Sequence, residues 1–125
     1  MANQTLVKEI CPTTTQDWIM RGALLVDVRE VEEVNELAYD VPNIINIPLS
    51  EFEDRYQEVP IDQEVVMVCR RGIRSLRAAG FLINHGYNPE KVVNMAYGVV
   101  CWAKRGFPTI GDVSSVSAYD SDSNC

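Results

Sequence analysis

Two short apolar runs constrain the fold of this chain more than any other feature. Residues 24–28 and 65–68 consist of leucine, valine and methionine, apart from Asp27. A strand with one face in water would alternate apolar and polar residues, so nearly unbroken runs are typical of strands that are buried on both faces. Such strands require helices on both sides of the sheet.

The segments around these runs supply the required helices. Apolar residues recur at helical spacing between the expected strands, and glycine or proline stands where several of these helices should end. Alternating strands and helices predict an α/β fold with a mainly parallel central sheet of about five strands and helices on both faces. The expected strands are residues 6–10, 24–28, 44–47, 64–68 and 91–95; the expected helices are residues 29–37, 50–56, 75–85 and 97–105, after a first helix capped near Thr13, Thr14 or Thr15.

The length of 125 residues suits one domain, which we expect to span residues 1–110. Residues 111–125 are rich in serine and aspartate, so they are expected to form a flexible polar tail. No apolar run approaches the length of a membrane span, and the N-terminus lacks a basic region followed by an apolar core. We therefore expect a cytoplasmic protein with no membrane partner.

The net charge of −7 argues against nucleic acid as a partner. The four cysteines are widely spread without a Cys-x-x-Cys pair, and the chain has one histidine, so neither a structural metal nor another cofactor is expected. Against this acidic background, the arginines of residues 70–77 form a local positive site. Such a site suits a small anionic substrate better than a polyanion.

Cys69 is the candidate nucleophile. It ends the apolar run at 65–68 and is followed by a short arginine-rich turn and then by a helix. This turn would direct backbone N–H groups and the positive end of a helix dipole at the sulfur, which favours thiolate over thiol. The carboxyl end of a buried strand is also where open α/β sheets bind ligands. The candidate site comprises Cys69, Arg70, Arg71, Gly72, Ile73, Arg74 and Ser75.

Other polar residues have structural interpretations. Asp27 and Arg29 follow the apolar part of a strand and are expected to pair with each other and fix the neighbouring loops. His85 is expected to meet free carbonyl oxygens at a helix C-terminus, so it is not assigned as a catalytic partner of Cys69. The glutamates of residues 29–37 are expected to form a solvated helix face.

Four ordered motifs resemble the single-domain rhodaneses, a family of sulfurtransferases. They are LLVDVRE at 24–30, NIPL at 46–49, CRRGIRS at 69–75, and a final helix with Trp102 before residues 106–108. The resemblance extends from residue 10 to residue 108. Two segments depart from the family pattern: residues 35–42 replace the usual glycine-histidine-isoleucine signature, and Ala96-Tyr97-Gly98 replaces the common paired glycines. The second departure places a tyrosine at the mouth of the site.

The resemblance implies a rhodanese-like three-layer fold and a sulfurtransferase activity. Cys69 would take a sulfane sulfur from thiosulfate or a related persulfide donor and become a persulfide. A thiol, a dithiol or cyanide would then remove that sulfur, with thioredoxin or glutathione as possible acceptors. The N–H groups from Arg70 to Ser75 would stabilise the persulfide, and Arg70, Arg71 and Arg74 would attract an anionic donor.

Two other functions remain open at this point. The protein could be a persulfide carrier or sulfur-relay module with little turnover of small molecules. A cysteine phosphatase or arsenate reductase is less favoured, since their loops resemble Cys-x5-Arg, whereas four residues separate Cys69 from Arg74 here. The shorter loop suits a single sulfur atom better than a tetrahedral phosphate.

The remaining cysteines are assigned by their surroundings. Cys11 and Cys101 are interpreted as buried packing residues. Cys125 ends the polar tail, where an exposed thiol is available for mixed disulfides, for dimer cross-links or for attack on a Cys69 persulfide.

Overall fold

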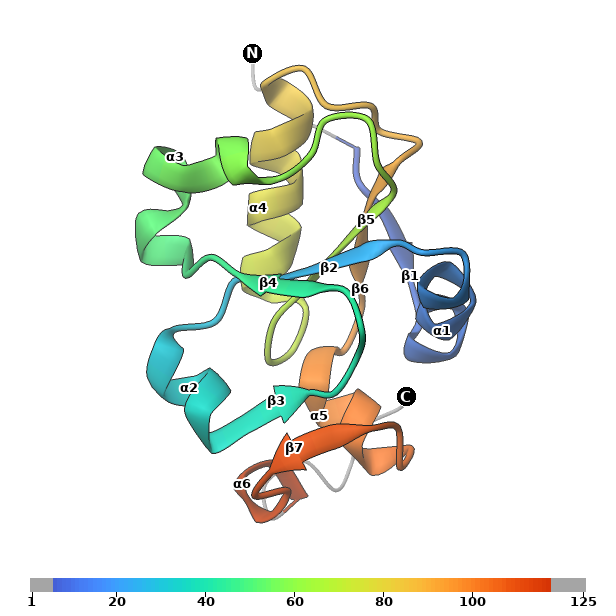
Figure 1. The fold of residues 1–125 in the computed structure, drawn as a ribbon, viewed down its shortest axis with the longest axis vertical. Coiled ribbons are helices and arrows are strands. Elements are labelled where there is room, and N and C mark those ends of the chain that lie inside the picture. Colours follow the sequence, from blue (N-terminus) through green and yellow to red (C-terminus); the bar gives the residue numbers. More distant parts are fainter. Residues whose placement is uncertain (1–5, 118–125) are drawn as a thin grey trace.

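The structure is a computed structural model in which residues 6–117 are described. Its centre is a five-stranded parallel sheet in the order β1-β6-β5-β2-β4 (Figure 1). The predicted parallel sheet of about five strands is therefore confirmed. These strands are β1 (Lys8–Ile10), β2 (Leu24–Asp27), β4 (Ile44–Asn46), β5 (Val65–Val68) and β6 (Val92–Met95).

Strand β5 lies in the middle of the sheet and is buried on both faces, as its sequence predicts. Its side chains alternate between two apolar cores. Val66 and Val68 belong to the core that contains Trp102, whereas Val65 and Met67 belong to the core on the opposite face. The unbroken apolar run is required because both of these cores meet at β5.

Helices cover both faces of the sheet (Figure 1). Trp18 and Trp102 contribute to the core on one face, and Phe52 and Leu82 contribute to the core on the other. Within residues 6–117, no helix is long and apolar enough to cross a bilayer. The helices are α1 (Pro12–Met20), α2 (Val31–Glu36), α3 (Phe52–Arg55), α4 (Ile73–Asn84) and α5 (Gly98–Lys104), with 3-10 turns at Leu49–Glu51 and Tyr56–Glu58.

A second, two-stranded sheet is absent from the sequence prediction. β3 (Leu37–Tyr39) pairs antiparallel with β7 (Thr109–Gly111). The helix expected at 29–37 is therefore shorter than predicted, because Leu37 already belongs to β3. Three-residue strands carry almost no periodic pattern, and their pairing joins distant parts of the chain, so local sequence does not indicate them.

Regular secondary structure continues past residue 110, where the sequence predicts the start of a polar tail. Gly111 is the last residue of β7, and a further helix, α6, covers Ser114–Ser117. Val116 is 1% exposed and belongs to the same core as Trp102. This one apolar side chain anchors a segment whose composition is otherwise polar. Residues 118–125, with Cys125, lie outside the described residues.

Cys11 differs from its prediction in two ways. It is the N-cap of α1, in place of the expected threonines, and its sulfur accepts a hydrogen bond from the N–H of Thr14 at 3.5 Å. Its side chain is exposed instead of buried. Pro12 explains the position of the cap, since proline is favoured at the first helical residue and the cap must precede it. Cys101, by contrast, is buried in α5 as expected, but it is disulfide-bonded and therefore more than a packing residue.

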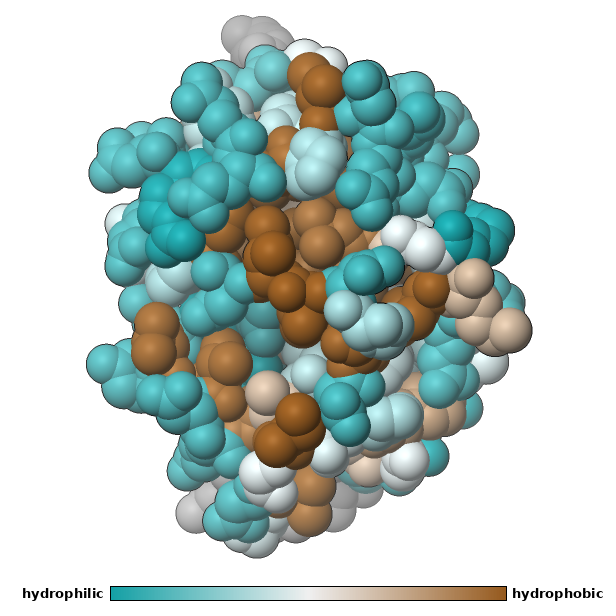
Figure 2. Space-filling view, in the orientation of Figure 1, coloured by the Kyte–Doolittle hydropathy of each residue, from teal (hydrophilic) through white to brown (hydrophobic). Residues whose placement is uncertain are grey.

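The edge strand β4 borders an open hollow of about 440 Å³. Figure 2 shows apolar side chains gathered near the middle of this face of the molecule. Leu24, Pro42, Ile44 and Ile45 are among the residues that line the hollow. These residues lie at or near the amino ends of β2 and β4, so the hollow is remote from the carboxyl ends of the strands.

Shortening Val116 tests whether α6 belongs to the folded domain. Val116→Ala removes buried methyl groups, so it should lower the free energy of unfolding by about 1–3 kcal/mol. Val113→Ala removes the same groups from a side chain that is 48% exposed, and it should change stability by less than about 0.5 kcal/mol. Urea unfolding of both variants makes the comparison. Equal effects would mean that residues 114–117 add nothing to the core.

Candidate active site

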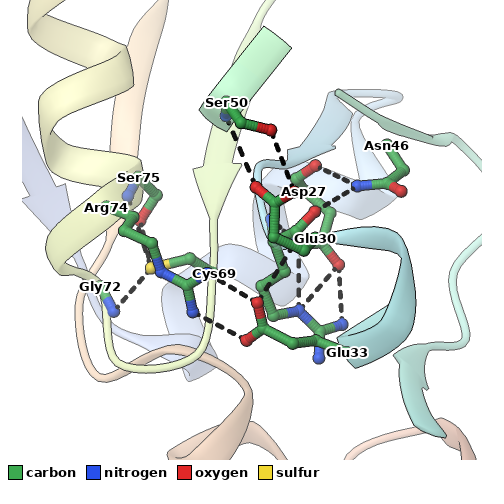
Figure 3. Close-up of polar contacts among 10 residues, drawn as sticks. Asp27, Glu30, Glu33, Asn46, Ser50, Cys69, Gly72, Arg74 and Ser75 are labelled. Atoms are coloured by element: carbon green, nitrogen blue, oxygen red, sulfur yellow. Dashed lines mark hydrogen bonds and ion pairs between the residues drawn. The ribbon is translucent and has the colours of Figure 1, made fainter. Parts of the chain in front are cut away.

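Cys69 lies directly after β5, where the chain enters the loop that leads to α4. Its side chain is 1% exposed, and hydrogen-bond donors surround its sulfur (Figure 3). The backbone nitrogen of Gly72 lies 3.1 Å from Sγ, that of Ser75 3.4 Å, and the Ser75 hydroxyl 3.2 Å. Such donors favour a charged sulfur over a neutral one. Three hydrogen-bond donors, all from the predicted loop, therefore converge on the sulfur of Cys69.

The carbonyl oxygens at the start of the loop are bonded to groups outside it. The oxygen of Cys69 accepts hydrogen bonds from the N–H of Val99 at 2.9 Å and from the hydroxyl of Tyr39 at 2.7 Å. The oxygen of Arg70 accepts a bond from the N–H of Val100 at 3.2 Å. The first turn of α5 and the side chain of Tyr39 on β3 thus hold these carbonyl groups in place.

The next fixed carbonyl belongs to Gly72, whose oxygen accepts a bond from Nδ2 of Asn94 at 2.9 Å. Gly72 has a φ of 91°, and a Cβ there would lie 3.0 Å from the backbone nitrogen of Tyr97. Gly98 has a φ of 61°, and a Cβ there would overlap the carbonyl group of Arg70. Both positions therefore require glycine, because the loop and the start of α5 are in direct backbone contact.

Arg74 extends from α4 toward α2. Its guanidinium donates two hydrogen bonds to the carboxylate of Glu33, at 2.7 and 2.8 Å (Figure 3). The bonds from Arg74 lower the pKa of Glu33, and the backbone N–H of Glu30 adds to this effect. The bonds to Glu33 raise the pKa of Arg74, and the negative charge of Cys69 contributes in the same direction. The prediction that these glutamates form a solvated face is therefore wrong for Glu33, which partly neutralises Arg74 beside the sulfur.

Glu30 connects α2 with the 3-10 turn before α3. Its carboxylate accepts a hydrogen bond from the hydroxyl of Ser50 at 3.0 Å, and its own N–H donates to Glu33 at 3.1 Å (Figure 3). Two carboxylates therefore lie near the loop on the side of α2. An anion that approaches from this side meets negative as well as positive charge.

The predicted pair of Asp27 and Arg29 is confirmed. Nε and Nη2 of Arg29 lie 3.0 and 2.7 Å from the carboxylate oxygens of Asp27, and both side chains are buried. Burial disfavours the charged guanidinium, but the hydrogen bonds and charge of Asp27 outweigh burial and raise the pKa of Arg29. The guanidinium also lies over the ring of Tyr39, at 5.4 Å from its centroid. Arg29, held by Asp27, thus packs on the ring of Tyr39, and Tyr39 in turn contacts Cys69.

The predicted site residues occupy different positions relative to the sulfur of Cys69. Gly72 and Ser75 contact the sulfur, Arg74 is paired with Glu33, and Arg71 and Ile73 are exposed on the outside of the loop. His85 contacts the carbonyl oxygen of Phe81 at 2.7 Å near the end of α4, as predicted. The sequence interpretation missed the three residues that hold the loop from other elements, namely Glu33, Tyr39 and Asn94.

A second thiol lies beside the loop. Cys11 lines a hollow of about 550 Å³ together with Arg71, Ile73 and Tyr97. The hydroxyl of Thr14, followed by its backbone N–H, lowers the pKa of Cys11. Tyr97 is therefore next to the loop, where the altered glycine motif predicts it. Across residues 6–117, no cluster of three or more histidine, cysteine or acidic side chains could hold a metal ion.

Comparison with known proteins gives consistent matches. Residues 12–105 match the sequence model of the family described as the rhodanese-like domain. A sulfurtransferase from Allochromatium vinosum is 34% identical over 87 residues, which cover 70% of this chain and 78% of that protein. A thiosulfate sulfurtransferase, GlpE, from Actinobacillus succinogenes is 32% identical over 102 residues, covering 80% and 87% of the two chains. The crystal structure of a rhodanese-related protein from Thermoplasma volcanium superposes with a TM-score of 0.72 at 26% identity, covering 84% of this chain and 99% of that one.

Neutralising Glu33 should destabilise the fold in a pH-dependent way. The folded-state pKa of Glu33 is lowered from its ordinary value of 4.5, so its contribution is present above that value and is lost as the pH falls through the lowered one. Glu33→Gln should therefore reduce the free energy of unfolding at neutral pH by about 0.5–1 kcal/mol, and the difference from the parent should vanish as the pH falls through the lowered pKa. Urea unfolding across this range measures it.

Glu58→Gln is the matched control, because Glu58 pairs with Arg55 on the surface and away from Cys69. The rate at which Cys69 is alkylated should change in Glu33→Gln and stay at the parent value in Glu58→Gln. A Glu33→Gln variant as stable as the parent at every pH would contradict a role for this ion pair.

Proposed function

The chain belongs to the rhodanese-like domain family, and from this membership and the donors around Cys69 we propose that it is a sulfurtransferase that works through a Cys69 persulfide. The thiolate of Cys69 attacks the outer sulfur of thiosulfate or a related persulfide donor. With thiosulfate, the new bond joins two sulfur atoms and the electron pair of the broken sulfur–sulfur bond leaves on sulfite. The outer sulfur keeps its negative charge and becomes the terminal sulfur of the persulfide.

In the second step, an acceptor removes this outer sulfur. Cyanide takes it as thiocyanate, and a thiolate takes it as a new persulfide; in either case Cys69 returns to the thiolate. A thiol or dithiol, such as glutathione or thioredoxin, is the acceptor we propose inside a cell. A cytoplasmic location, where such thiols stay reduced, is part of the same proposal.

The observation that carries this proposal is that three hydrogen-bond donors, from Gly72 and Ser75, converge on the sulfur of Cys69. In both steps the attacking group and the leaving group are anions, so the loop needs to stabilise negative charge on sulfur and does not need to transfer a proton. The N–H groups between Arg70 and Ser75 are proposed to bind the outer sulfur of the persulfide.

The arginines are proposed to attract an anionic donor, with different contributions. Arg71 is exposed on the outside of the loop, where it can meet an incoming anion. Arg74 is already bonded to Glu33, so the carboxylate of Glu33 partly neutralises its charge. The pull on a doubly charged donor is accordingly weaker than three arginines in six residues suggest.

This neutralisation favours the persulfide carrier as the second candidate function. A carrier that receives its sulfur from a protein partner needs the donors around Cys69 but gains little from a strong attraction for small anions. The two functions differ in turnover. Both form the persulfide, but only the enzyme passes sulfur quickly to a small acceptor.

Replacing the nucleophile tests both functions. Cys69→Ser should abolish thiocyanate formation from thiosulfate and cyanide, because serine cannot accept the sulfane sulfur. Cys11→Ser keeps a good helix N-cap and should retain the parent rate. Mass spectrometry after incubation with thiosulfate should find one added sulfur atom on the peptide that contains Cys69. Thiocyanate formation that survives in Cys69→Ser would overturn the mechanism, and a stable adduct without turnover would identify a carrier.

The KM for an anionic sulfur donor such as thiosulfate should depend on Arg71 and on the salt concentration. An exposed ionic contact contributes about 0.2–1 kcal/mol, so Arg71→Ala should raise the KM for thiosulfate about 1.5- to 5-fold. This difference should shrink as the ionic strength rises. Lys91→Ala removes the same charge just before β6, at the opposite end of the parallel strands from Cys69, and should leave KM unchanged. Equal KM values for the parent and Arg71→Ala at low salt would contradict the electrostatic argument.

A further inference from the structure

The phenol of Tyr39 contacts the backbone of the nucleophile. Tyr39 is the last residue of β3, and its side chain is 2% exposed. Its hydroxyl donates a buried hydrogen bond to the carbonyl oxygen of Cys69 at 2.7 Å. Tyr39 lies within residues 35–42, where this chain departs from the glycine-histidine-isoleucine pattern of the family it resembles.

Neighbouring side chains fix the ring of Tyr39. The indole of Trp102 meets it edge to face, with 5.5 Å between the ring centroids. The guanidinium of Arg29 lies over the ring at 5.4 Å and is itself held by Asp27. The hydroxyl therefore has little freedom to leave the carbonyl oxygen of Cys69.

Tyr39 also remains a hydrogen-bond donor over the working pH range. Burial raises the pKa of its phenol well above the usual value, and the negative charges of Asp27 and Cys69 act in the same direction. The positive charge of Arg29 opposes these effects without cancelling them. The phenol therefore stays protonated whenever Cys69 reacts.

A donor at this carbonyl affects the sulfur through charge and through geometry. The carbonyl oxygen of Cys69 carries partial negative charge on the same residue as the reacting thiolate, and hydrogen bonds to it reduce the repulsion between them. The same bonds fix the orientation of the peptide that begins the loop. The N–H groups of Gly72 and Ser75 can then stay directed at Sγ.

We propose that Tyr39 is a positioning residue for the Cys69 nucleophile, acting through the carbonyl oxygen of Cys69 to keep the loop in its thiolate-stabilising conformation. The effect on the thiolate stands on the geometry alone. The effect on sulfur transfer rests on the function proposed above.

Tyr87 provides a matched control. It is also buried, and its hydroxyl also donates to backbone carbonyl oxygens, those of Val59 at 2.6 Å and Tyr56 at 3.2 Å. These oxygens lie in the segment around the second 3-10 turn and not in the Cys69 loop. Tyr87→Phe therefore removes the same kind of hydrogen bond without touching the loop.

The test measures the rate of iodoacetamide alkylation of the Cys69 peptide by mass spectrometry as a function of pH. A hydrogen bond of ordinary strength corresponds to a shift of about 0.3–1 pH unit, so the midpoint for Tyr39→Phe should rise by that amount. The kcat for sulfur transfer should fall about 2- to 10-fold while the KM for thiosulfate stays unchanged, since Tyr39 is buried away from the donor. Tyr87→Phe should leave all three quantities at the parent values.

A midpoint that stays at the parent value in Tyr39→Phe, or that moves equally in Tyr87→Phe, would overturn the proposal. If Tyr39→Phe is partly unfolded by thermal melting, 3-fluorotyrosine placed at position 39 decides instead. It is a stronger donor of nearly the same shape, so it should lower the midpoint, and an unchanged or raised midpoint would reject the role. Because alkylation needs no sulfur donor, a parent protein without transferase activity would disprove the proposed function and leave this test intact.

Discussion

The site depends on where the backbone carbonyl oxygens of the Cys69 loop are bonded. A loop that concentrates N–H groups on one sulfur atom must direct its carbonyl oxygens elsewhere, and buried oxygens need partners of their own. Here those partners come from three separate elements: Tyr39 on β3, Asn94 on β6 and the first N–H groups of α5. Gly98 completes the arrangement because a side chain at that position would push the loop away from α5. The sheet and its helices are therefore the framework that holds these partners at one end of β5.

Electrostatic balance is the second constraint on this site. The loop carries three arginines, yet the protein as a whole is acidic, and α2 brings Glu30 and Glu33 to the same end of the sheet. Arg74 consequently bridges two elements as well as contributing charge. The contacts to the sulfur of Cys69 come from backbone N–H groups and a hydroxyl, and such short contacts are screened less than exposed side-chain charges. The loop thus directs hydrogen-bond donors at the sulfur of Cys69, while part of its positive charge is paired with a carboxylate.

The sequence predicts the parts of this structure that local pattern determines. The unbroken apolar runs identify β2 and β5, and the cysteine, glycine and arginine pattern identifies the loop, because each of these signals lies within a few neighbouring residues. Glu33, Tyr39 and Asn94 could not be assigned in the same way, since their roles depend on which distant segments the fold places beside the loop. The three-residue strands β3 and β7 lack periodicity for the same reason, and their pairing is a long-range contact. Pro12 is the local signal that marks Cys11 as the helix cap, because proline is favoured at the first helical position and the cap must precede it.

The pairing of β3 with β7 has a consequence for the order in which the site can form during synthesis. β3 carries Tyr39, but the strand that pairs with it ends at Gly111, more than forty residues beyond Cys69 in the chain. The motifs that identify the family are all complete before residue 111. While the ribosome still covers the last part of the domain, Cys69 and its loop can already be exposed without the paired strands β3 and β7 beside them. The surroundings of the thiol are completed only when nearly the whole domain has emerged.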